Sequence, residues 1–248
     1  MKKTTKRVLI GTGIFVALIV LLLLGYMLKI KSELKTMSPI ETKEIVTNIF
    51  SIQDSFSNLF LIKDSDQYIA IDGGNNIDSV ASELKKLTIN PDKVTAVLLT
   101  HTDADHVASL KLFKNAKIYL SKQEEQLING TKSRVLFFKN SIGTKEYSLI
   151  ADQQILNIGN LQIKGYLTPG HTPGSMCYLI NNKYLFTGDA LSLKLGKIGK
   201  FNEFFNMDTP TAISSIAQIT NIPEVQYIFT AHYGYSNDYK NAVKDWAK

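Results

Sequence analysis

The sequence predicts a mixed α/β domain with two β-sheets, each faced by helices, preceded by one transmembrane helix. Three observations carry this prediction. Residues 8–28 form an apolar segment without a single charge. Beyond it, apolar runs typical of strands alternate with runs of helical spacing in both halves of the chain. All four histidines lie at or close to the ends of predicted strands.

The apolar segment 8–28 is long enough to cross a bilayer, because its residues rise by about 1.5 Å each and span roughly 30 Å as a helix. A cleaved signal peptide would have a shorter apolar region and a small-residue cleavage site, and none follows here. We therefore expect a retained anchor over residues 1–30, a juxtamembrane linker over 31–44 and a catalytic domain over 45–248. The short basic N-terminus favours a single-pass topology with the domain on the extracytoplasmic side.

The net charge of +6 belongs entirely to the N-terminal region. Residues 1–35 hold seven basic side chains and one acid, which leaves 21 basic and 21 acidic side chains in the remainder. A globular part without excess charge has no bulk attraction for polyanions, so we expect no nucleic acid partner. The one cysteine, Cys177, excludes an intramolecular disulfide and is expected to be an inert core residue.

The globular part begins with strands. Residues 45–52, 57–63 and 67–71 alternate or run apolar, which predicts an antiparallel meander. Residues 77–87 have apolar side chains at helical spacing. Residues 94–100 are a continuous apolar run, typical of a strand buried on both faces.

The middle of the chain is less regular. We expect a helix over residues 105–113, a short strand over 118–120 and a helix near 122–128. The stretch 121–150 is rich in Lys, Asn and Ser, and we interpret it as a variable insertion without a recognisable motif.

The second half resumes with strands, which we expect at residues 155–158, 161–167, 175–180, 183–186 and 227–230. Two of them would form a hairpin over Asn181-Asn182, a pair that tolerates positive φ. Asp208 is placed to cap a helix over 209–219, and 238–246 would form the last helix.

The densest group of chemically active side chains is the hexapeptide HTDADH at residues 101–106. In extended backbone His101, Asp103 and Asp105 point to the same side, and at a turn into a helix Asp105 and His106 can point to two neighbouring centres. Imidazole and carboxylate together suit zinc, iron or manganese. The alternative is a solvated surface loop.

The remaining histidines favour the metal site. His171 and His232 follow predicted strands, and Asp189 follows another. Loops converge at such strand ends, and ligand sites gather there. A solvated loop would not require every histidine of the chain to occupy such positions.

Five segments resemble the metallo-β-lactamase superfamily in their order and spacing, over nearly all of residues 45–248. They are IDGG (71–74), LLTHTDADH (98–106), TPGHTPGS (168–175), FTGDAL (186–191) and TAH (230–232). The resemblance implies a four-layer αβ/βα sandwich with a dinuclear metal site at one edge.

By position, the resemblance implies seven ligands: His101, Asp103 and His171 for a first ion, Asp105, His106 and His232 for a second, and Asp189 for both. The two divalent ions would be zinc, with iron or manganese as alternatives. They would share a hydroxide that attacks the substrate, because two cations lower the pKa of bound water from about 15.7 toward 7. Asp105 would also be catalytic by orienting or protonating groups.

Asp103 departs from the usual motif H-x-H-x-D-H, in which this position is histidine. A carboxylate is a harder ligand, which shifts the preference toward iron or manganese. Some relatives also carry a carboxylate here: DNA-uptake channel proteins have H-P-D-A-D-H, and flavo-diiron oxygen reductases have Glu. We therefore keep Asp103 as a ligand; the alternative is a partner that orients a ligand histidine.

Four further features complete the expected site. Asp72 would support a ligand from behind or only cap a turn. Tyr233 and Tyr235 would line the substrate pocket or simply pack as aromatics. The aromatic segment 201–207 would form a wall or lid of the pocket. Gly170 and Gly174 would allow the tight loop around His171.

The resemblance is nearest to the hydroxyacylglutathione hydrolase and lactonase branches, which implies a membrane-anchored hydrolase of ester, thioester or lactone-type bonds. Its partners would be a small-molecule substrate and the lipid bilayer around residues 8–28. A phosphodiesterase or nuclease-like hydrolase and an iron-dependent oxidoreductase of the same fold are the alternatives. A non-catalytic module with this fold is the third, against which the complete ligand set argues.

Overall fold

A computed structural model describes residues 3–246 of the chain. It divides into two compact units, the first ending at Met37 and the second beginning at Ser38.

The first unit is a single long helix, α1 (Lys3–Leu34). Its stretch Ile10–Leu34 is long and apolar enough to cross a membrane, and none of that stretch is buried in the protein. The apolar segment 8–28 therefore lies inside a helix that continues beyond it. The continuation follows from the sequence, because no glycine or proline interrupts the chain between Gly25 and Pro39.

The linker expected over residues 31–44 is in fact short. Residues 31–34 belong to α1. Ser38 N donates to His232 O at 2.8 Å, and Ile40 N donates to Asn58 Oδ1 at 2.7 Å. The chain therefore belongs to the second unit from Ser38 onward, because the backbone N–H groups of Ser38 and Ile40 donate to residues of that unit.

The second unit contains two large sheets and one small one. The first sheet has the order β1-β2-β3-β4-β5-β6-β7, with β1 (Lys43–Val46), β2 (Ile49–Asp54), β3 (Ser57–Asp64), β4 (Gln67–Ile71), β5 (Val94–Leu98), β6 (Lys117–Ser121) and β7 (Ser148–Ile150). Its first four strands pair antiparallel, and β4 to β7 pair parallel. The expected meander and the buried central strand are both present.

The second sheet has the order β15-β14-β11-β10-β9-β8, with β8 (Ile155–Ile158), β9 (Leu161–Leu167), β10 (Met176–Ile180), β11 (Tyr184–Phe186), β14 (Tyr227–Phe229) and β15 (Tyr235–Ser236). β12 (Ser192–Lys194) and β13 (Lys197–Gly199) form a separate hairpin. Asn181 and Asn182 join β10 to β11 with φ of 51° and 53°, as their tolerance of positive φ predicts.

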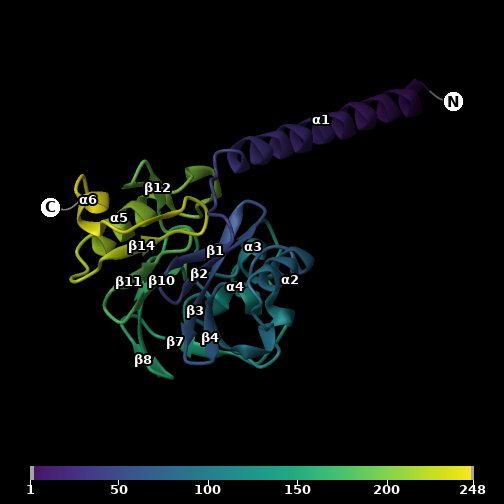
Figure 1. Cartoon of the computed structure of the whole chain (residues 1–248). Coiled ribbons are helices and arrows are strands. Elements are labelled where there is room, and N and C mark those ends of the chain that lie inside the picture. Colours follow the sequence, from purple (N-terminus) through teal and green to yellow (C-terminus); the bar gives the residue numbers. More distant parts are fainter. Residues whose placement is uncertain (1–2, 247–248) are drawn as a thin grey trace. The chain divides into compact units, whose positions relative to one another are not determined.

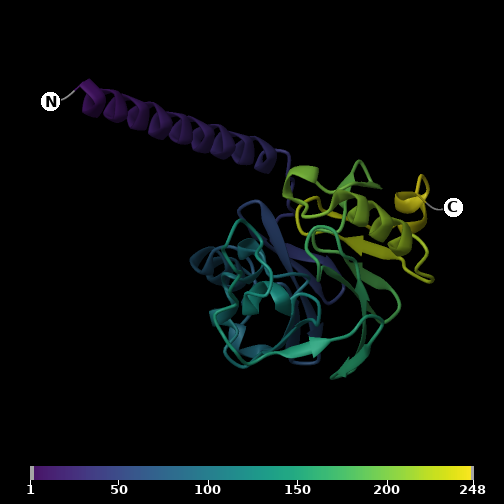
Figure 2. The same cartoon turned by 180° about the vertical axis from the view of Figure 1, so that it is seen from behind.

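Helices cover the outer faces of both sheets (Figures 1 and 2): α2 (Ile77–Lys86), α3 (Ala104–Val107) and α4 (Glu125–Asn129) beside the first, α5 (Thr209–Ile219) and α6 (Tyr239–Val243) beside the second. Asp208 caps α5 as predicted, accepting from Thr211 N at 3.1 Å. The unit is therefore the αβ/βα sandwich that the sequence predicts.

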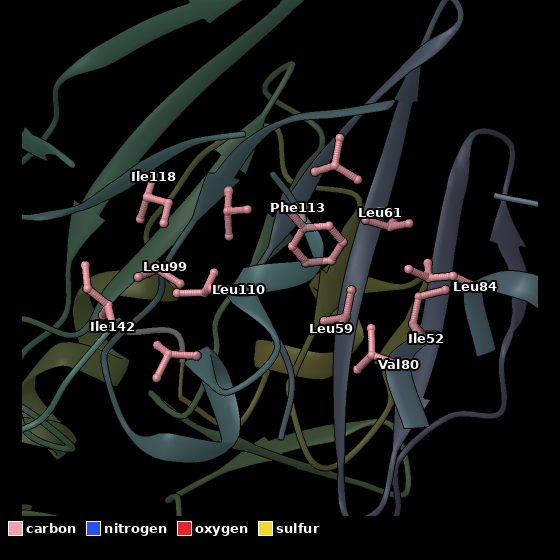
Figure 3. Close-up of a cluster of buried hydrophobic side chains, with 14 of the residues drawn as sticks. Ile52, Leu59, Leu61, Val80, Leu84, Leu99, Leu110, Phe113, Ile118 and Ile142 are labelled. Carbon is pink, nitrogen blue, oxygen red and sulfur yellow. The ribbon is translucent and has the colours of Figure 1, made fainter. Parts of the chain in front are cut away.

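Two apolar cores hold these layers together, and β3 contributes to both. Leu59 and Leu61 face α2, where they join Val80 and Leu84 in the cluster of Figure 3. Phe60 lies in the other cluster, between the two sheets. Successive side chains of a strand point to opposite faces, so a continuous apolar run is what a strand between a helix layer and a second sheet requires.

Two predicted elements are broken in the structure. The strand expected over 45–52 is split into β1 and β2 by a turn at Asn48, which has φ 65°. The helix expected over 105–113 ends at Val107 and resumes as the short 3₁₀ helix Leu110–Leu112. It ends there because Ser109 N donates to Gly73 O at 3.1 Å, a partner from another loop.

Candidate metal centre

The predicted ligand residues lie just after strands, in loops at one edge of the two sheets. His101, Asp103, Asp105 and His106 lie in the loop after β5 and in α3. His171 lies between β9 and β10, Asp189 follows β11 and His232 follows β14. The four histidines and Asp189 are buried, with exposed fractions of 1–5%, whereas Asp103 and Asp105 are partly exposed.

The structure brings all seven side chains together as three overlapping groups. The groups are His101 with Asp103 and His171, Asp105 with His106 and His232, and His101 with His106 and Asp189; within each, the donor atoms lie within 4.8 Å of one another. Such spacing permits the three residues of a group to bind one cation together.

Asp189 lies between the histidines of the two predicted half-sites. Its Oδ2 is 3.5 Å from His171 Nε2 and 3.9 Å from His101 Nε2. Its Oδ1 is 3.1 Å from His232 Nε2 and 3.5 Å from His106 Nε2. One carboxylate oxygen thus faces each half-site, which is the placement that a bridging ligand needs.

The donor atoms fit a metal ion. Among the residues that the structure describes, Nε2 of His101, Nε2 of His106 and Oδ1 of Asp189 are buried without a hydrogen-bond partner. A buried polar atom without a partner is costly unless something else satisfies it. These three atoms belong to residues whose donor atoms lie within 4.8 Å of one another, so one divalent cation would satisfy them together.

The opposite nitrogens of three histidines are held from behind. His106 Nδ1 lies 2.9 Å from Asp72 Oδ2, His232 Nδ1 lies 2.8 Å from Phe56 O, and His101 Nδ1 lies 3.1 Å from Thr100 Oγ1. Such partners fix the orientation of each ring and leave Nε2 for the ion.

Asp72 contacts two segments that carry candidate ligand histidines. Its Oδ1 accepts from Thr100 N at 2.8 Å, so the carboxylate ties the end of β5 to α3. Its backbone has φ 65°, a left-handed conformation that Asp tolerates better than most residues. The structure therefore supports both alternatives weighed for Asp72, a turn residue and a support for a candidate ligand.

Electrostatics favour the cation-binding forms of Asp189 and His101, which are the carboxylate and the neutral imidazole. Burial would raise the pKa of Asp189, but the charges of His232 and His106 hold that pKa well below its ordinary value. Burial lowers the pKa of His101 well below its usual range. Burial would lower the pKa of His106 too, but Asp105 and other carboxylates raise it well above its usual range. A cation would replace the proton on such an imidazole.

Arg134 is a site residue that the sequence analysis missed. Its Nε lies 2.9 Å from both oxygens of Asp103, and its Nη2 lies 2.7 Å from Asp103 Oδ2. The same Nη2 is 3.3 Å from His171 Nε2 and donates to Phe205 O at 2.7 Å. Arg134 is one of only two arginines in a lysine-rich chain, and that rarity was the available signal.

Asp103 has several partners at once. Asn140 Nδ2 donates to its Oδ1 at 3.0 Å, and its Oδ2 is 3.1 Å from His171 Nε2. Burial would raise the pKa of Asp103, but the contacts with His171, His101 and Arg134 hold that pKa well below its ordinary value. Asp103 Oδ2 thus lies 3.1 Å from His171 Nε2 and 3.7 Å from His101 Nε2, and the same carboxylate forms an ion pair with Arg134.

Glu124 is a second residue that the sequence analysis missed. Its Oε1 accepts from the N and Oγ1 of Thr102, at 2.8 and 2.7 Å, and its Oε2 accepts from Thr172 Oγ1 at 2.7 Å. Thr102 and Thr172 each follow a histidine of the first half-site, so this buried carboxylate links the two loops. Burial raises the pKa of Glu124 above its ordinary value.

Aromatic side chains form a wall beside the histidines. The Phe201 ring lies 5.0 Å from the His171 ring and 5.9 Å from the His232 ring, so part of the segment 201–207 packs on the site as expected. Tyr233 is buried 6.1 Å from Phe201. Tyr235 stacks on Phe229 in the core between the sheets, which is the packing role that was its alternative.

Gly170, Gly174 and Cys177 have the structural roles that the sequence predicts. A Cβ on Gly170 would overlap the backbone of Ala212, and its φ is 137°. A Cβ on Gly174 would overlap the backbone of Glu124. Cys177 is fully buried in β10, and burial raises the pKa of its thiol to about 12.

The second unit is an αβ/βα sandwich with a His/Asp cluster at its strand ends, and these are the residue types that hold metal ions in proteins. The chain belongs to the metallo-beta-lactamase superfamily, whose profile matches residues 52–221. The membership confirms the fold class that the sequence motifs predict.

Curated relatives carry hydrolase names. The chain is 34% identical over 138 residues to the "Probable polyketide biosynthesis zinc-dependent hydrolase PksB" of Bacillus subtilis (strain 168), over 53% of this chain and 54% of that protein. It is 29% identical over 196 residues to the hydroxyacylglutathione hydrolase of Buchnera aphidicola subsp. Schizaphis graminum (strain Sg), over 78% and 68%. The chain spans about half the length of the first curated relatives it matches.

Solved structures share the fold at low sequence identity. A B3 metallo-beta-lactamase with an active site glutamic acid superposes with a TM-score of 0.65 at 18% identity, over 88% of this chain and 90% of that one. The B3 metallo-beta-lactamase BJP-1 of Bradyrhizobium japonicum gives 0.61 at 17% identity, over 79% of each chain.

Proposed function

We propose that the protein is a membrane-anchored hydrolase that uses two divalent metal ions, zinc in the first instance, to cleave an ester, thioester or lactone-type bond in a small-molecule substrate. The observation that carries the proposal is the convergence of seven His and Asp side chains, of which His101, His106 and Asp189 each have a buried donor atom without a hydrogen-bond partner. The zinc-dependent hydrolase and hydroxyacylglutathione hydrolase names of the relatives support the reaction class.

The ligand roles follow the three groups of donors. His101, Asp103 and His171 would hold one ion, and Asp105, His106 and His232 the other. Asp189 would contact both, since its two oxygens face different histidine pairs. When bound, the two ions would lower the pKa of a water molecule toward neutrality and polarise the carbonyl of the substrate.

Asp105 is the group best placed to handle a proton. Its side chain is 22% exposed, while the imidazoles of His106 and His232 beside it are buried. Its Oδ2 lies 3.5 Å from His106 Nε2 and 3.4 Å from His232 Nε2. A carboxylate that faces both the donors and solvent can orient a water molecule and receive its proton.

Helix α1 supports the membrane anchoring. Its stretch Ile10–Leu34 spans 25 residues and is apolar enough to cross a membrane, and most of the apolar side chains in it are exposed. Lys2, Lys3, Lys6 and Arg7 precede the apolar stretch, which favours the single-pass orientation with the catalytic domain outside the cytoplasm.

The experiment is metal quantification on the full chain in lipid nanodiscs, followed by a substrate panel of a short-chain ester, a thioester, a lactone and a phosphodiester. We expect two zinc ions per chain and activity on a carbonyl substrate that a chelator removes and zinc restores. Activity confined to the phosphodiester, or iron content with oxygen uptake, would overturn the proposed reaction. Extraction of the chain from membranes by alkaline carbonate would overturn the anchoring.

A further inference from the structure

A cluster of apolar side chains is exposed on a loop that leads directly to the candidate metal centre. Val135, Leu136, Phe137 and Phe138 are 50%, 82%, 79% and 61% exposed. We call residues 135–138 the apolar tip. Exposed apolar patches of neighbouring residues mark contacts with a protein, a ligand or a membrane.

The apolar tip has a defined conformation. Phe138 N donates to Val135 O at 2.9 Å, and Arg134 N donates to Phe138 O at 3.3 Å, which closes a tight turn. Leu136 at its apex has φ 51°, an uncommon conformation for a residue with a Cβ. The turn therefore presents its apolar side chains outward at a cost in backbone strain, which points to a use for them.

The base of the loop is fastened to the metal centre. Arg134, on one side of the apolar tip, forms the ion pair with Asp103. Asn140, on the other side, donates to Asp103 Oδ1 at 3.0 Å and to Thr102 Oγ1 at 3.1 Å. Whatever the apolar tip contacts is thereby held close to the proposed ligand Asp103.

The charges around the apolar tip are those of a membrane-contacting loop. The exposed Lys132 and Lys139 flank it. Besides Arg134, which is paired with Asp103, residues 131–146 contain three lysines and one acid, Glu146, although the globular part as a whole has no net charge. Apolar side chains bordered by lysines combine insertion into the acyl region with attraction to anionic lipid headgroups.

The attachment of the chain limits how far the domain can move from the end of α1. The helix ends at Leu34, and Ser38 N already donates to His232 O at 2.8 Å. The four intervening steps of backbone reach at most about 14 Å when fully extended. If α1 spans a bilayer, this short connection tethers the start of the catalytic domain to the membrane.

We propose that the apolar tip inserts into the bilayer that holds α1, and that the metal centre acts there on amphiphilic acyl substrates. This inference rests on the proposed function, because it needs both the anchor and the hydrolytic site. An acyl ester or thioester in the same bilayer would present its polar bond to the metal centre while its chain remains in the lipid.

Fluorescence quenching tests the insertion on the full chain, independently of catalysis. Phe137→Trp is reconstituted in phosphatidylcholine/phosphatidylglycerol vesicles whose acyl chains carry bromine. The control is Ile155→Trp, since Ile155 is 51% exposed on β8, and the unsubstituted chain gives the background of Trp246. We expect bromine to quench the introduced Phe137→Trp fluorescence by about twofold or more and to change the control little.

Equal quenching of the two variants would overturn the insertion. A blue-shifted Phe137→Trp emission without bromine quenching would also overturn it, because a second protein copy or this chain itself would then cover the apolar tip. Metal content and short-chain ester hydrolysis are measured on the same vesicles. If the chain in these vesicles held no metal and hydrolysed no ester but its Phe137→Trp fluorescence were still quenched, the proposed hydrolase would be refuted. The membrane contact would then still be supported.

Kinetics test the substrate class. The ratio of activities on a long-chain ester in vesicles and a short-chain soluble ester is compared for the unsubstituted chain, Leu136→Ser and Ile155→Ser. We expect Leu136→Ser to lower this ratio about fivefold or more and Ile155→Ser to leave it unchanged. An unchanged ratio in Leu136→Ser would overturn the amphiphilic substrate.

Discussion

Arg134 and Asp103 form an ion pair at the candidate metal centre through two nitrogens of the guanidinium. Nη2 lies 2.7 Å and Nε lies 2.9 Å from Asp103 Oδ2. That oxygen also lies 3.1 Å from His171 Nε2, so the guanidinium occupies space that borders the first proposed ion. A fixed positive charge beside one half-site disfavours a cation there. The two half-sites are therefore electrostatically unequal.

This inequality predicts stepwise metal binding. Arg134→Gln removes the charge but keeps a hydrogen-bond donor, so we expect the weaker of two zinc sites to tighten by about tenfold, equivalent to about 1.4 kcal/mol. Titration of the metal-free full chain against a competing chelator measures both affinities. Lys139→Gln, on the same loop but exposed, is the control. Weaker binding in Arg134→Gln would mean that the arginine mainly orients Asp103.

Asp189→Ala removes the carboxylate that faces both half-sites. We expect hydrolysis to be abolished and the metal content to fall, because both groups of histidines lose a shared donor. Elemental analysis of the purified chain is the measurement, and the exposed Asp92→Ala serves as the matched variant. Full activity in Asp189→Ala would remove the bridging assignment.

Asp72→Asn tests the support behind His106. The amide would place an NH₂ donor or a neutral oxygen opposite Nδ1, so the ring loses its charged acceptor. We expect zinc affinity to fall by about 10- to 100-fold. Asparagine tolerates the positive φ of this position, so the turn should remain. Asp78→Asn, exposed in α2, controls for the charge change, and equal affinities in the two variants would contradict the role.

Gly170→Ala should destabilise the domain by about 2 kcal/mol or more, since the new Cβ overlaps the backbone of Ala212 at the start of α5. Differential scanning fluorimetry should show its melting temperature falling by about 4 °C or more. Gly196→Ala is the control, because Gly196 also has positive φ but open space around its Cα. Equal shifts in the two variants would show that backbone strain alone matters.

Cys177 gives a prediction on pH. Burial raises its thiol pKa to about 12, so the thiol stays protonated between pH 7 and 10. We expect no reaction with Ellman's reagent in the native chain over this range and one equivalent after denaturation. Increasing reaction of the native chain toward pH 9, without loss of its fold, would disprove the assignment of Cys177 to an inert core position.

Sequence patterns predicted the strands that lie in the centre of each sheet, because a strand between two layers must be apolar on both faces, as β3 and β10 are. They did not reveal β7, β12, β13 and β15, which have only two or three residues each and too little length for a period. The break after Val107 also escaped prediction. It depends on backbone bonds to Gly73 and Gly74, more than 30 residues earlier in the chain.

The candidate site likewise contains residues that the sequence predicted and residues that it did not. The histidines, Asp103 and Asp189 were found because they follow apolar strands and match a motif. Arg134 and Glu124 were missed because neither lies in a local motif, and the rarity of arginine in the chain was the one signal for Arg134. They reach Asp103 and Thr172 across 31 and 48 residues of sequence, and only the folded chain brings them there.

The hydrogen bond from Ser38 N to His232 O has a practical consequence for preparing a water-soluble form of the protein. A truncation that begins at or before Ser38 keeps the peptide group of His232 occupied. One that begins at Lys43, the first residue of β1, would delete both that bond and the bond from Ile40 to Asn58, and would expose the backbone that carries a proposed ligand. Assays on such a shortened form would then underestimate metal retention for a reason unrelated to the chemistry of the site.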